Sequence, residues 1–164
     1  MSAIDDLLRS NEDYAKKFDR AGLPMPPSRR VAVVACMDAR LDVYRLLGLE
    51  PGEAHVIRNA GGVVTEDVVR SLLISQRLLG TREIILVHHT ECGMTTFRDD
   101  EVKAEIEADT GLRPPFALEA FDDTTTDVRQ SIDGSRANPF IPHTDHVRGF
   151  VYDVETGRLE EVTT

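Results

Sequence analysis

The sequence predicts an α/β fold: a mainly parallel β-sheet flanked by helices, with an antiparallel edge strand near the C-terminus. Residues 31–35 and 84–87 are apolar runs rich in β-branched side chains, which is typical of parallel strands buried on both faces. Helical patterns alternate with such runs along the chain. Two further strand-like runs, at residues 147–153 and 159–162, are joined by a turn at residues 155–157 and predict the antiparallel edge.

The chain begins with a helical pattern at residues 5–18. A breaker-rich stretch follows at residues 22–27, where three prolines in four positions cannot continue a helix. We therefore expect a single domain over residues 1–164 that carries an N-terminal helical arm at residues 1–23. The apolar side of this arm predicts that it packs on a partner subunit.

The elements between the two apolar runs follow the same alternation. A short helix is expected at residues 42–47 and a strand at residues 54–58. A longer helix at residues 66–79 has an apolar face and acidic residues in its first turn, which complement the positive end of the helix dipole. Gly80 ends this helix, and the strand at residues 84–87 follows.

Beyond that strand the sequence is acidic. Residues 99–109 predict an acidic helix, residues 111–115 a break, and residues 126–132 another short helix. Residues 99–127 contain ten acidic and two basic residues. We interpret this cluster as a solvated surface, with a partner-binding surface as the alternative.

The overall composition is normal for a soluble protein, with 41% hydrophobic and 29% charged residues. The balance of 19 basic to 29 acidic residues argues against nucleic acid binding, because phosphates would be repelled. No apolar run is long enough to span a membrane, and residues 1–6 lack the features of a secretion signal. We therefore expect no membrane association and a cytoplasmic location, where two cysteines would stay reduced.

Two short motifs carry the chemistry: residues 36–40 (CMDAR) and residues 89–93 (HTECG), which together contain both cysteines of the chain. Each motif follows a predicted buried strand, and the carboxyl ends of parallel strands can meet at one edge of a sheet. Zinc prefers thiolate and imidazole ligands, and a catalytic zinc keeps three protein ligands and one exchangeable position. Cys36, His89 and Cys92 therefore form a candidate Zn²⁺ site.

Asp38 and Arg40 distinguish this site from a structural zinc site. The Asp38 carboxylate is close enough to Cys36 to fill the fourth metal position or to leave a water there, and Arg40 can hold it through paired N–H bonds. An ordinary ion pair is the alternative interpretation. We choose His89 as the ligand because successive strand residues face opposite sides, so that His88 turns away as a packed or hydrogen-bonded neighbour.

These motifs resemble the signature of the β-class carbonic anhydrases, which is Cys-x-Asp-x-Arg followed roughly fifty residues later by His-x-x-Cys. Residues 58–62 (RNAGG) are similar to a segment that lines the pocket beside the metal in that family. The resemblance covers most of the chain. The substrate-pocket residues that it implies are Asn59, Ala60, Gly61, Gly62 and Gly93.

The resemblance also implies roles for the two motifs. Cys36, His89 and Cys92 would be the zinc ligands, and Asp38 with Arg40 would be the catalytic dyad. In some members of the family the aspartate binds zinc in a closed, inactive state, and in others it pairs with the arginine and leaves a water on the metal. Asp38 is therefore also a candidate metal ligand. A homodimer, or a multiple of one such as a homotetramer, is expected.

Two departures from the family pattern are visible. Ala39 stands where many members have serine, and residues 26–29 replace a stretch in which longer, plant-like members have a pocket glutamine. The chain therefore looks like the compact bacterial type. Compact chains in the same superfamily also resemble hydrolases of carbonyl sulfide or carbon disulfide, and the metal ligands do not distinguish these enzymes.

The reaction that we expect is reversible hydration of carbon dioxide to bicarbonate and a proton, the activity of a carbonate dehydratase, which is a zinc lyase. Zinc lowers the pKa of its bound water, so that a zinc-bound hydroxide can attack the carbon. Two thiolates should leave that water less acidic than imidazoles would, so activity should favour alkaline pH. The histidines that could carry the proton, each with a surface or hydrogen-bonded role as the alternative, are His55, His143 and His146.

Two other functions stay open from the sequence. Carbonyl sulfide hydrolysis at the same zinc site is the enzymatic alternative. The other is a non-catalytic zinc-binding or redox-sensing domain, in which both cysteines, His89 and Asp38 would close a tetrahedron around the metal. A pH-dependent hydratase rate would distinguish the enzyme hypothesis from the hypothesis of a non-catalytic domain.

Overall fold

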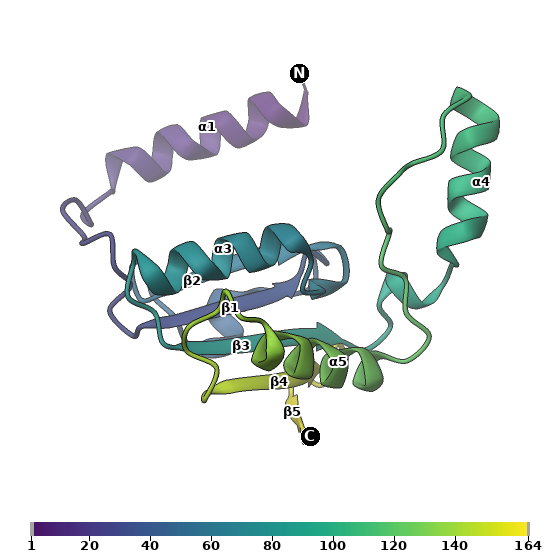
Figure 1. The fold of residues 1–164 in the computed structure, drawn as a ribbon. Helices are drawn as coiled ribbons and strands as arrows, with labels where there is room; N and C mark the ends of the chain where they lie inside the picture. Colours follow the sequence, from purple (N-terminus) through teal and green to yellow (C-terminus); the bar gives the residue numbers. More distant parts are fainter. Residues whose placement is uncertain (1, 164) are drawn as a thin grey trace.

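A five-stranded β-sheet forms the centre of the protein in the computed structural model, which describes residues 2–163 (Figure 1). The strand order is β2-β1-β3-β4-β5. Strands β1 to β4 pair in parallel, and β5 pairs antiparallel with β4, so the predicted fold class is confirmed. The strands are β1 (Val31–Cys36), β2 (Ala54–Asn59), β3 (Glu83–His89), β4 (Val147–Tyr152) and β5 (Leu159–Val162).

Helices connect the strands, and two 3₁₀ turns follow β2 and β3. The helices are α1 (Ala3–Lys16), α2 (Val43–Leu47), α3 (Glu66–Arg77), α4 (Asp99–Thr110) and α5 (Thr124–Ala137), and the turns are η1 (Ala60–Gly62) and η2 (Gly93–Thr95). None of the described helices is long and apolar enough to cross a membrane.

Helix α5 is longer than the helix predicted at residues 126–132. Its buried face contains Ser131 and Ser135 beside its apolar residues, and these small polar side chains hide the amphipathic pattern in the sequence. Close packing of this helix on the sheet depends on Gly149 of β4, where a Cβ atom would lie only 2.4 Å from a side-chain carbon of Val128.

Hydrophobic side chains fill both sides of the central strands, as the apolar runs predict. All residues of β1 after Val31 are buried. One core, between the sheet and helices α3 and α5, includes Ala32, Val34, Leu72, Ile84, Leu86, Val128 and Ile132. The other core, on the side of α2, includes Val33, Ala35, Leu41, Val43 and Val87 and reaches Cys36 and Cys92.

The carboxyl ends of the central strands meet at one edge of the sheet. Cys36, the last residue of β1, pairs in register with Asn59 of β2. Ala35 pairs with Val87 of β3, and β3 ends two residues later at His89. The strand pairing therefore brings the two sequence motifs together, as expected for parallel strands.

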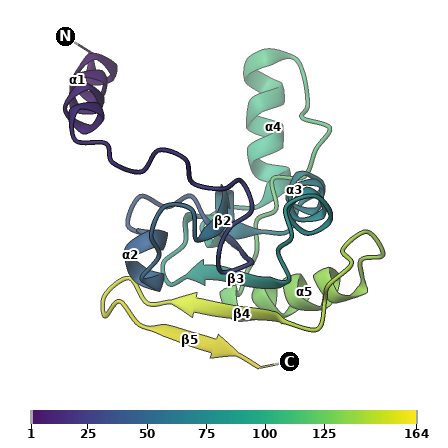
Figure 2. The same ribbon diagram turned by 90° about the vertical axis from the view of Figure 1, so that its left-hand side faces the viewer.

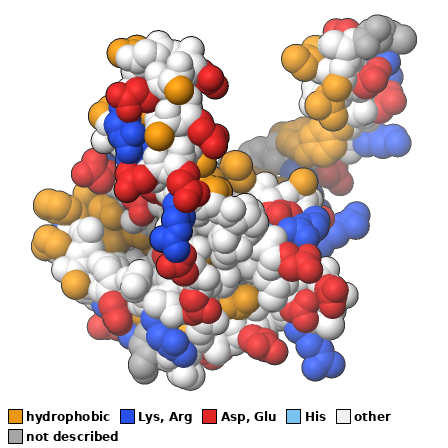
Figure 3. Space-filling model, turned by 90° about the vertical axis from the view of Figure 1, so that its right-hand side faces the viewer, with side chains coloured by type: hydrophobic (Ala, Val, Ile, Leu, Met, Phe, Trp, Pro, Cys, Tyr) orange, Lys and Arg blue, Asp and Glu red, His pale blue; other side chains and the backbone are white. Residues whose placement is uncertain are grey.

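Helices α1 and α4 stand away from the sheet and bury none of their residues (Figures 1 and 2). Helix α1 starts with a capping box between Ser2 and Asp5 and ends at Lys16, two residues before the predicted end. The acidic side chains of α4 are red in Figure 3. The large hydrophobic side chains that α1 and the following residue 18 expose are Ile4, Leu7, Leu8, Tyr14 and Phe18.

Candidate metal centre

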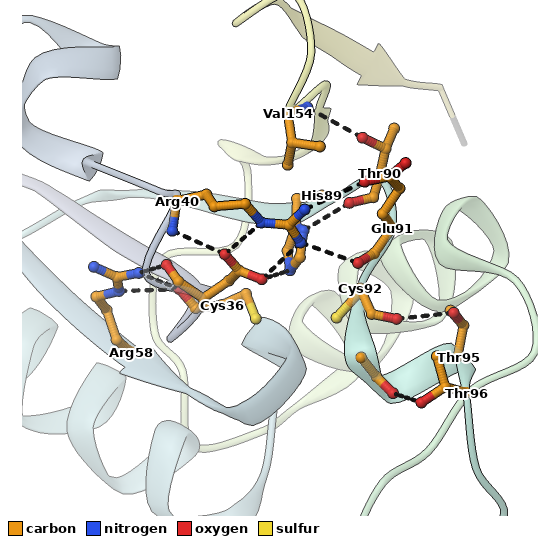
Figure 4. Close-up of polar contacts among 12 residues, drawn as sticks. Cys36, Arg40, Arg58, His89, Thr90, Glu91, Cys92, Thr95, Thr96 and Val154 are labelled. Carbon is orange, nitrogen blue, oxygen red and sulfur yellow. Dashed lines mark hydrogen bonds and ion pairs between the residues drawn. The ribbon is translucent and has the colours of Figure 1, made fainter.

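Two thiols and one imidazole converge at the carboxyl edge of the sheet. Cys36 ends β1, His89 ends β3, and Cys92 follows in the turn into η2. All three residues are buried, and their ligand atoms lie within 4.8 Å of one another. The three side chains point toward one another in Figure 4. This group can hold a metal ion.

The hydrogen bonds of His89 prepare its imidazole for a metal. Its Nδ1 lies 2.8 Å from the backbone oxygen of Thr90, which can only accept, so Nδ1 carries the proton. The lone pair is therefore on Nε2, which is buried and has no hydrogen-bond partner. A buried polar atom without a partner is costly, and a metal ion among the thiols would satisfy it. The residues present thus fit a bound metal.

The charges of the group also favour a cation. A hydrogen bond from the Cys92 thiol holds the pKa of Cys36 well below its usual range, and the same bond raises the pKa of Cys92. Burial opposes protonation of His89, but the nearby Cys36 thiolate raises its pKa overall. The site therefore concentrates negative charge where a metal ion would bind.

Asp38 lies beside this group, held by Arg40. The Asp38 carboxylate accepts hydrogen bonds from the Arg40 backbone N–H at 2.8 Å, from Nε at 3.0 Å and from Nη2 at 2.9 Å. These bonds hold the pKa of Asp38 well below its usual range. Its Oδ2 lies 3.7 Å from His89 Nε2, next to the donor atoms but not among the three that cluster. The structure therefore has the arginine-paired arrangement of Asp38.

Arg40 also connects the two motifs through Glu91, a residue without a predicted role. The Arg40 Nη2 donates to the Glu91 backbone oxygen at 3.1 Å, and its Nη1 lies 3.2 Å from the Glu91 carboxylate. Glu91 has a φ of 53°, so the turn between His89 and Cys92 passes through the left-handed region. The position of Glu91 between two predicted ligands was its one signal in the sequence.

A cavity of about 160 Å³ opens beside the group. Most of its exposed lining is apolar, and Ala60, Gly61 and Gly93 of the expected pocket residues belong to it. The complete lining is Cys36, Met37, Asp38, Ala60, Gly61, His89, Cys92, Gly93 and Met94. Only a small molecule fits this space beside the three donors.

Asn59 and Gly62, the other two expected pocket residues, lie outside that lining. The Asn59 side chain donates to the Val63 backbone oxygen at 2.9 Å and thus closes turn η1. Gly62 is buried with a φ of 73°, and a Cβ there would lie 2.8 Å from the Cys36 nitrogen and 2.9 Å from the Val87 oxygen. These contacts hold the chain beside the cavity, whose lining includes neither residue.

His88 points to the opposite side of the sheet from His89. It is fully buried, and its Nε2 lies 2.7 Å from Oδ2 of Asp127 in the first turn of α5. The ring of Phe121 packs against it at a centroid distance of 5.5 Å. This arrangement agrees with the expected role as a hydrogen-bonded neighbour, although the partner is 39 residues away in the sequence.

The three histidines considered for proton transfer lie away from the cavity. His55 binds Ser75 Oγ through Nδ1 at 2.7 Å, and burial lowers its pKa. The backbone of His143 binds the Gln76 side chain, and the backbone oxygen of His146 accepts from Ile84 at the start of β3. His55 lies near the start of β2, and the other two histidines lie just before β4, whereas the metal centre lies at the carboxyl ends of β1 and β3.

Similarity to known proteins identifies the family. A sequence model of the family described as carbonic anhydrase matches residues 31–113. Beta-carbonic anhydrase 1 of Mycobacterium tuberculosis (strain ATCC 25618 / H37Rv) is 61% identical over 163 residues, which cover 99% of each chain. The chain belongs to the β-carbonic anhydrase family. The β-carbonic anhydrases are carbonate dehydratases, so this is a family of lyases.

Two other relatives show the range of proteins to which the chain is similar. A crystal structure of carbonic anhydrase from Streptococcus mutans is 43% identical and superposes with a TM-score of 0.93, covering 99% of each chain. A carbon disulfide hydrolase of Acidianus sp. (strain A1-3) is 34% identical over 183 residues, which cover 96% of this chain and 88% of that protein. The family thus includes relatives with different named substrates.

Proposed function

We propose that the protein is a zinc-dependent enzyme that catalyses reversible hydration of carbon dioxide to bicarbonate and a proton. The observation that carries this proposal is the buried Cys36, His89 and Cys92 group, with an arginine-held carboxylate beside it. Two thiols and one imidazole match the ligand preference of zinc and leave one position for exchange. The 61% identity to Beta-carbonic anhydrase 1 supports the same activity.

When bound, zinc would supply a Lewis acid that makes hydroxide available near neutral pH. Asp38 would orient the attacking water molecule. Because Arg40 keeps its carboxyl group ionised, Asp38 can only accept hydrogen bonds. Its Oδ2 faces His89 and keeps capacity for a second hydrogen bond beside that from Arg40. A water molecule in the cavity would therefore point its O–H at Asp38 and a lone pair toward the substrate carbon.

The lining of the cavity suits an uncharged substrate. Met37, Ala60 and Met94 bring apolar surface to the space beside the donors. Carbon dioxide needs no ionic partner to enter such a space, whereas the bicarbonate product is charged and gains nothing from the apolar lining. The small volume excludes larger carbonyl compounds from the same position.

The hydration rate is expected to rise with pH through neutrality. Two thiolates place negative charge at the site, which opposes loss of a proton from water there, so activity needs more alkaline conditions than an all-imidazole site would. The pKa of Asp38 lies far below this range, so its protonation does not contribute to the profile. Stopped-flow rates from about pH 6.5 to about pH 9 measure the profile; a rate that falls as pH rises would contradict this prediction.

Hydrolysis of carbonyl sulfide or carbon disulfide is the second candidate, because a carbon disulfide hydrolase is 34% identical to this chain over 183 residues. The test compares stopped-flow carbon dioxide hydration with sulfide release from both sulfur compounds, using the same zinc-loaded preparation. We expect hydration to be the fast reaction. Rapid sulfide release without carbon dioxide hydration would assign the protein to the sulfur hydrolases instead.

We also propose that the protein works as a homodimer, or as a homotetramer made of such dimers, in the cytoplasm, where its thiols stay reduced. Helix α1 supports this assembly, because none of its residues is buried within the protomer and one side of the helix is apolar. The 14 residues of α1 would gain their stability from packing on a second subunit, since isolated helices of this length are marginal in water.

Charged substitutions on the apolar side of α1 are expected to weaken the dimer. The double variant Leu7→Glu with Leu8→Glu places two charges at positions that are 70% and 60% exposed here and would be buried in the dimer. Asp13→Asn, on the opposite side of the same helix, is the matched control. Light scattering and thermal melting measure the effect; a double variant that remains a dimer of unchanged stability would exclude α1 from the interface.

A further inference from the structure

Arg58 connects the end of β2 to the chain that carries Cys36 and Asp38. Its Nε and Nη2 donate to the Cys36 backbone oxygen at 2.9 Å and 2.8 Å. The same Nη2 donates to the Asp38 backbone oxygen at 2.7 Å. Figure 4 shows the Arg58 guanidinium beside Cys36. One side chain thus holds the backbone on both sides of the exposed residue Met37.

This contact lies where strand pairing stops. The β1–β2 register ends at Cys36 and Asn59, and one further backbone bond joins the Met37 N–H to the Asn59 oxygen at 2.7 Å. Beyond that point the Asp38 backbone oxygen accepts from Arg58 Nη2 at 2.7 Å and from the Leu41 backbone N–H at 3.0 Å. Arg58 therefore adds a link from β2 to this loop at the position where the pairing of β1 with β2 ends.

Arg58 and Arg40 hold different parts of the same residue. Arg40 binds the Asp38 carboxylate, whereas Arg58 binds the Asp38 carbonyl oxygen. Fixing both ends leaves Asp38 Oδ2 at 3.7 Å from His89 Nε2. A guanidinium can serve two carbonyl groups at once because its N–H groups form a rigid planar fork, which a lysine ammonium lacks.

We propose that Arg58 is a positioning residue for the metal centre: it fixes the Cys36 thiol and the Asp38 carboxylate relative to His89. The proposal rests on the zinc site proposed above. Groups that orient metal ligands without touching the metal typically change metal affinity or activity by about 10–100-fold when they are replaced. Arg58 does not bind the side chain of a ligand; it binds the backbone oxygen of the ligand residue Cys36.

The test compares Arg58→Gln and Arg58→Lys with wild type and with Arg45→Ala as the control. Arg45, in helix α2, is also an arginine at the surface; its side chain is 90% exposed, and among residues 2–163 its ion pair is with Asp42. The measurements are the zinc dissociation constant by chelator competition, the visible spectrum of the cobalt-substituted protein, and the melting temperature without metal.

We expect Arg58→Gln to weaken zinc binding by about 10–100-fold and to change the cobalt absorption bands, with Arg58→Lys between it and wild type. Arg45→Ala should match wild type in both measurements. A purely structural role would lower the melting temperature without metal and leave the cobalt spectrum unchanged. If Arg58→Gln does not fold, the spectrum and zinc affinity of Arg58→Lys decide.

Wild-type zinc affinity and cobalt spectra in the folded Arg58 variants would overturn this inference and leave the zinc site intact. A wild-type protein that binds no zinc would overturn the proposed function, and this inference with it. The two failures are therefore distinguished by the wild-type preparation alone.

Discussion

Replacing Cys36 or Cys92 with serine is expected to remove the metal and to reduce carbon dioxide hydration to the rate without enzyme. A serine hydroxyl does not ionise readily and cannot replace a thiolate ligand. Each variant would also leave His89 Nε2 buried without a partner, so we expect a lower melting temperature. Elemental analysis and stopped-flow kinetics on the same preparations measure both effects.

Full zinc content in either variant would contradict the ligand assignment. Met37→Leu offers a matched control, because Met37 follows Cys36 directly, is 64% exposed and has no place among the three clustered donors. This control should keep its zinc. The comparison separates loss of a ligand from general disturbance of the loop.

Asp38→Ala and Arg40→Ala are expected to keep zinc but to lose most of the hydration rate. Asp38→Ala removes the acceptor that orients water, and a loss on the order of 10²-fold is typical when a reacting group is misplaced. Arg40→Ala removes the two side-chain hydrogen bonds to the Asp38 carboxylate, although the bond from the residue 40 backbone N–H can persist. The freed carboxylate, 3.7 Å from His89 Nε2, could then move onto the metal and close the site.

Arg40→Lys separates charge from geometry in this pair. A lysine keeps the positive charge but cannot make the paired contacts to both carboxylate oxygens, so we expect an intermediate rate. Zinc content and hydration rate across pH are the measurements. Wild-type rates in Arg40→Ala at every pH would show that the pair does not control the position of Asp38.

The strands and the metal cluster could be predicted because the signals are local. Buried parallel strands read as apolar runs, and each motif follows such a run directly, so the pairing of β1 with β3 was enough to bring Cys36 and His89 together. The choice between His88 and His89 needed only the alternation of side chains along a strand. Each of these inferences depends on neighbours within a few residues.

The contacts that could not be predicted join residues far apart in sequence. Arg58 reaches the Cys36 carbonyl across 22 positions, and Asp127 meets His88 across 39. Both depend on how far a side chain extends once strands and helices are in place. The length of α5 was underestimated for another reason, because Ser131 and Ser135 on its buried face replace the apolar residues that a periodicity argument counts.

The two pocket residues that lie outside the cavity show the same limit. Ala60 and Gly61 line it, whereas Asn59 and Gly62 in the same short segment turn toward the protein. Adjacent residues in a tight turn face different directions, and the φ values of 82° at Gly61 and 73° at Gly62 are not visible in a motif. Family resemblance identifies such a segment but not the side that each residue presents.

Titration of zinc into the metal-free protein, with the carbon dioxide hydration rate measured at each step, tests the central claim most directly. The rate is expected to rise in proportion to bound zinc and to level off at one zinc per chain, as a single group of Cys36, His89 and Cys92 requires. A hydration rate that does not depend on zinc, or no hydration at one zinc per chain, would contradict it.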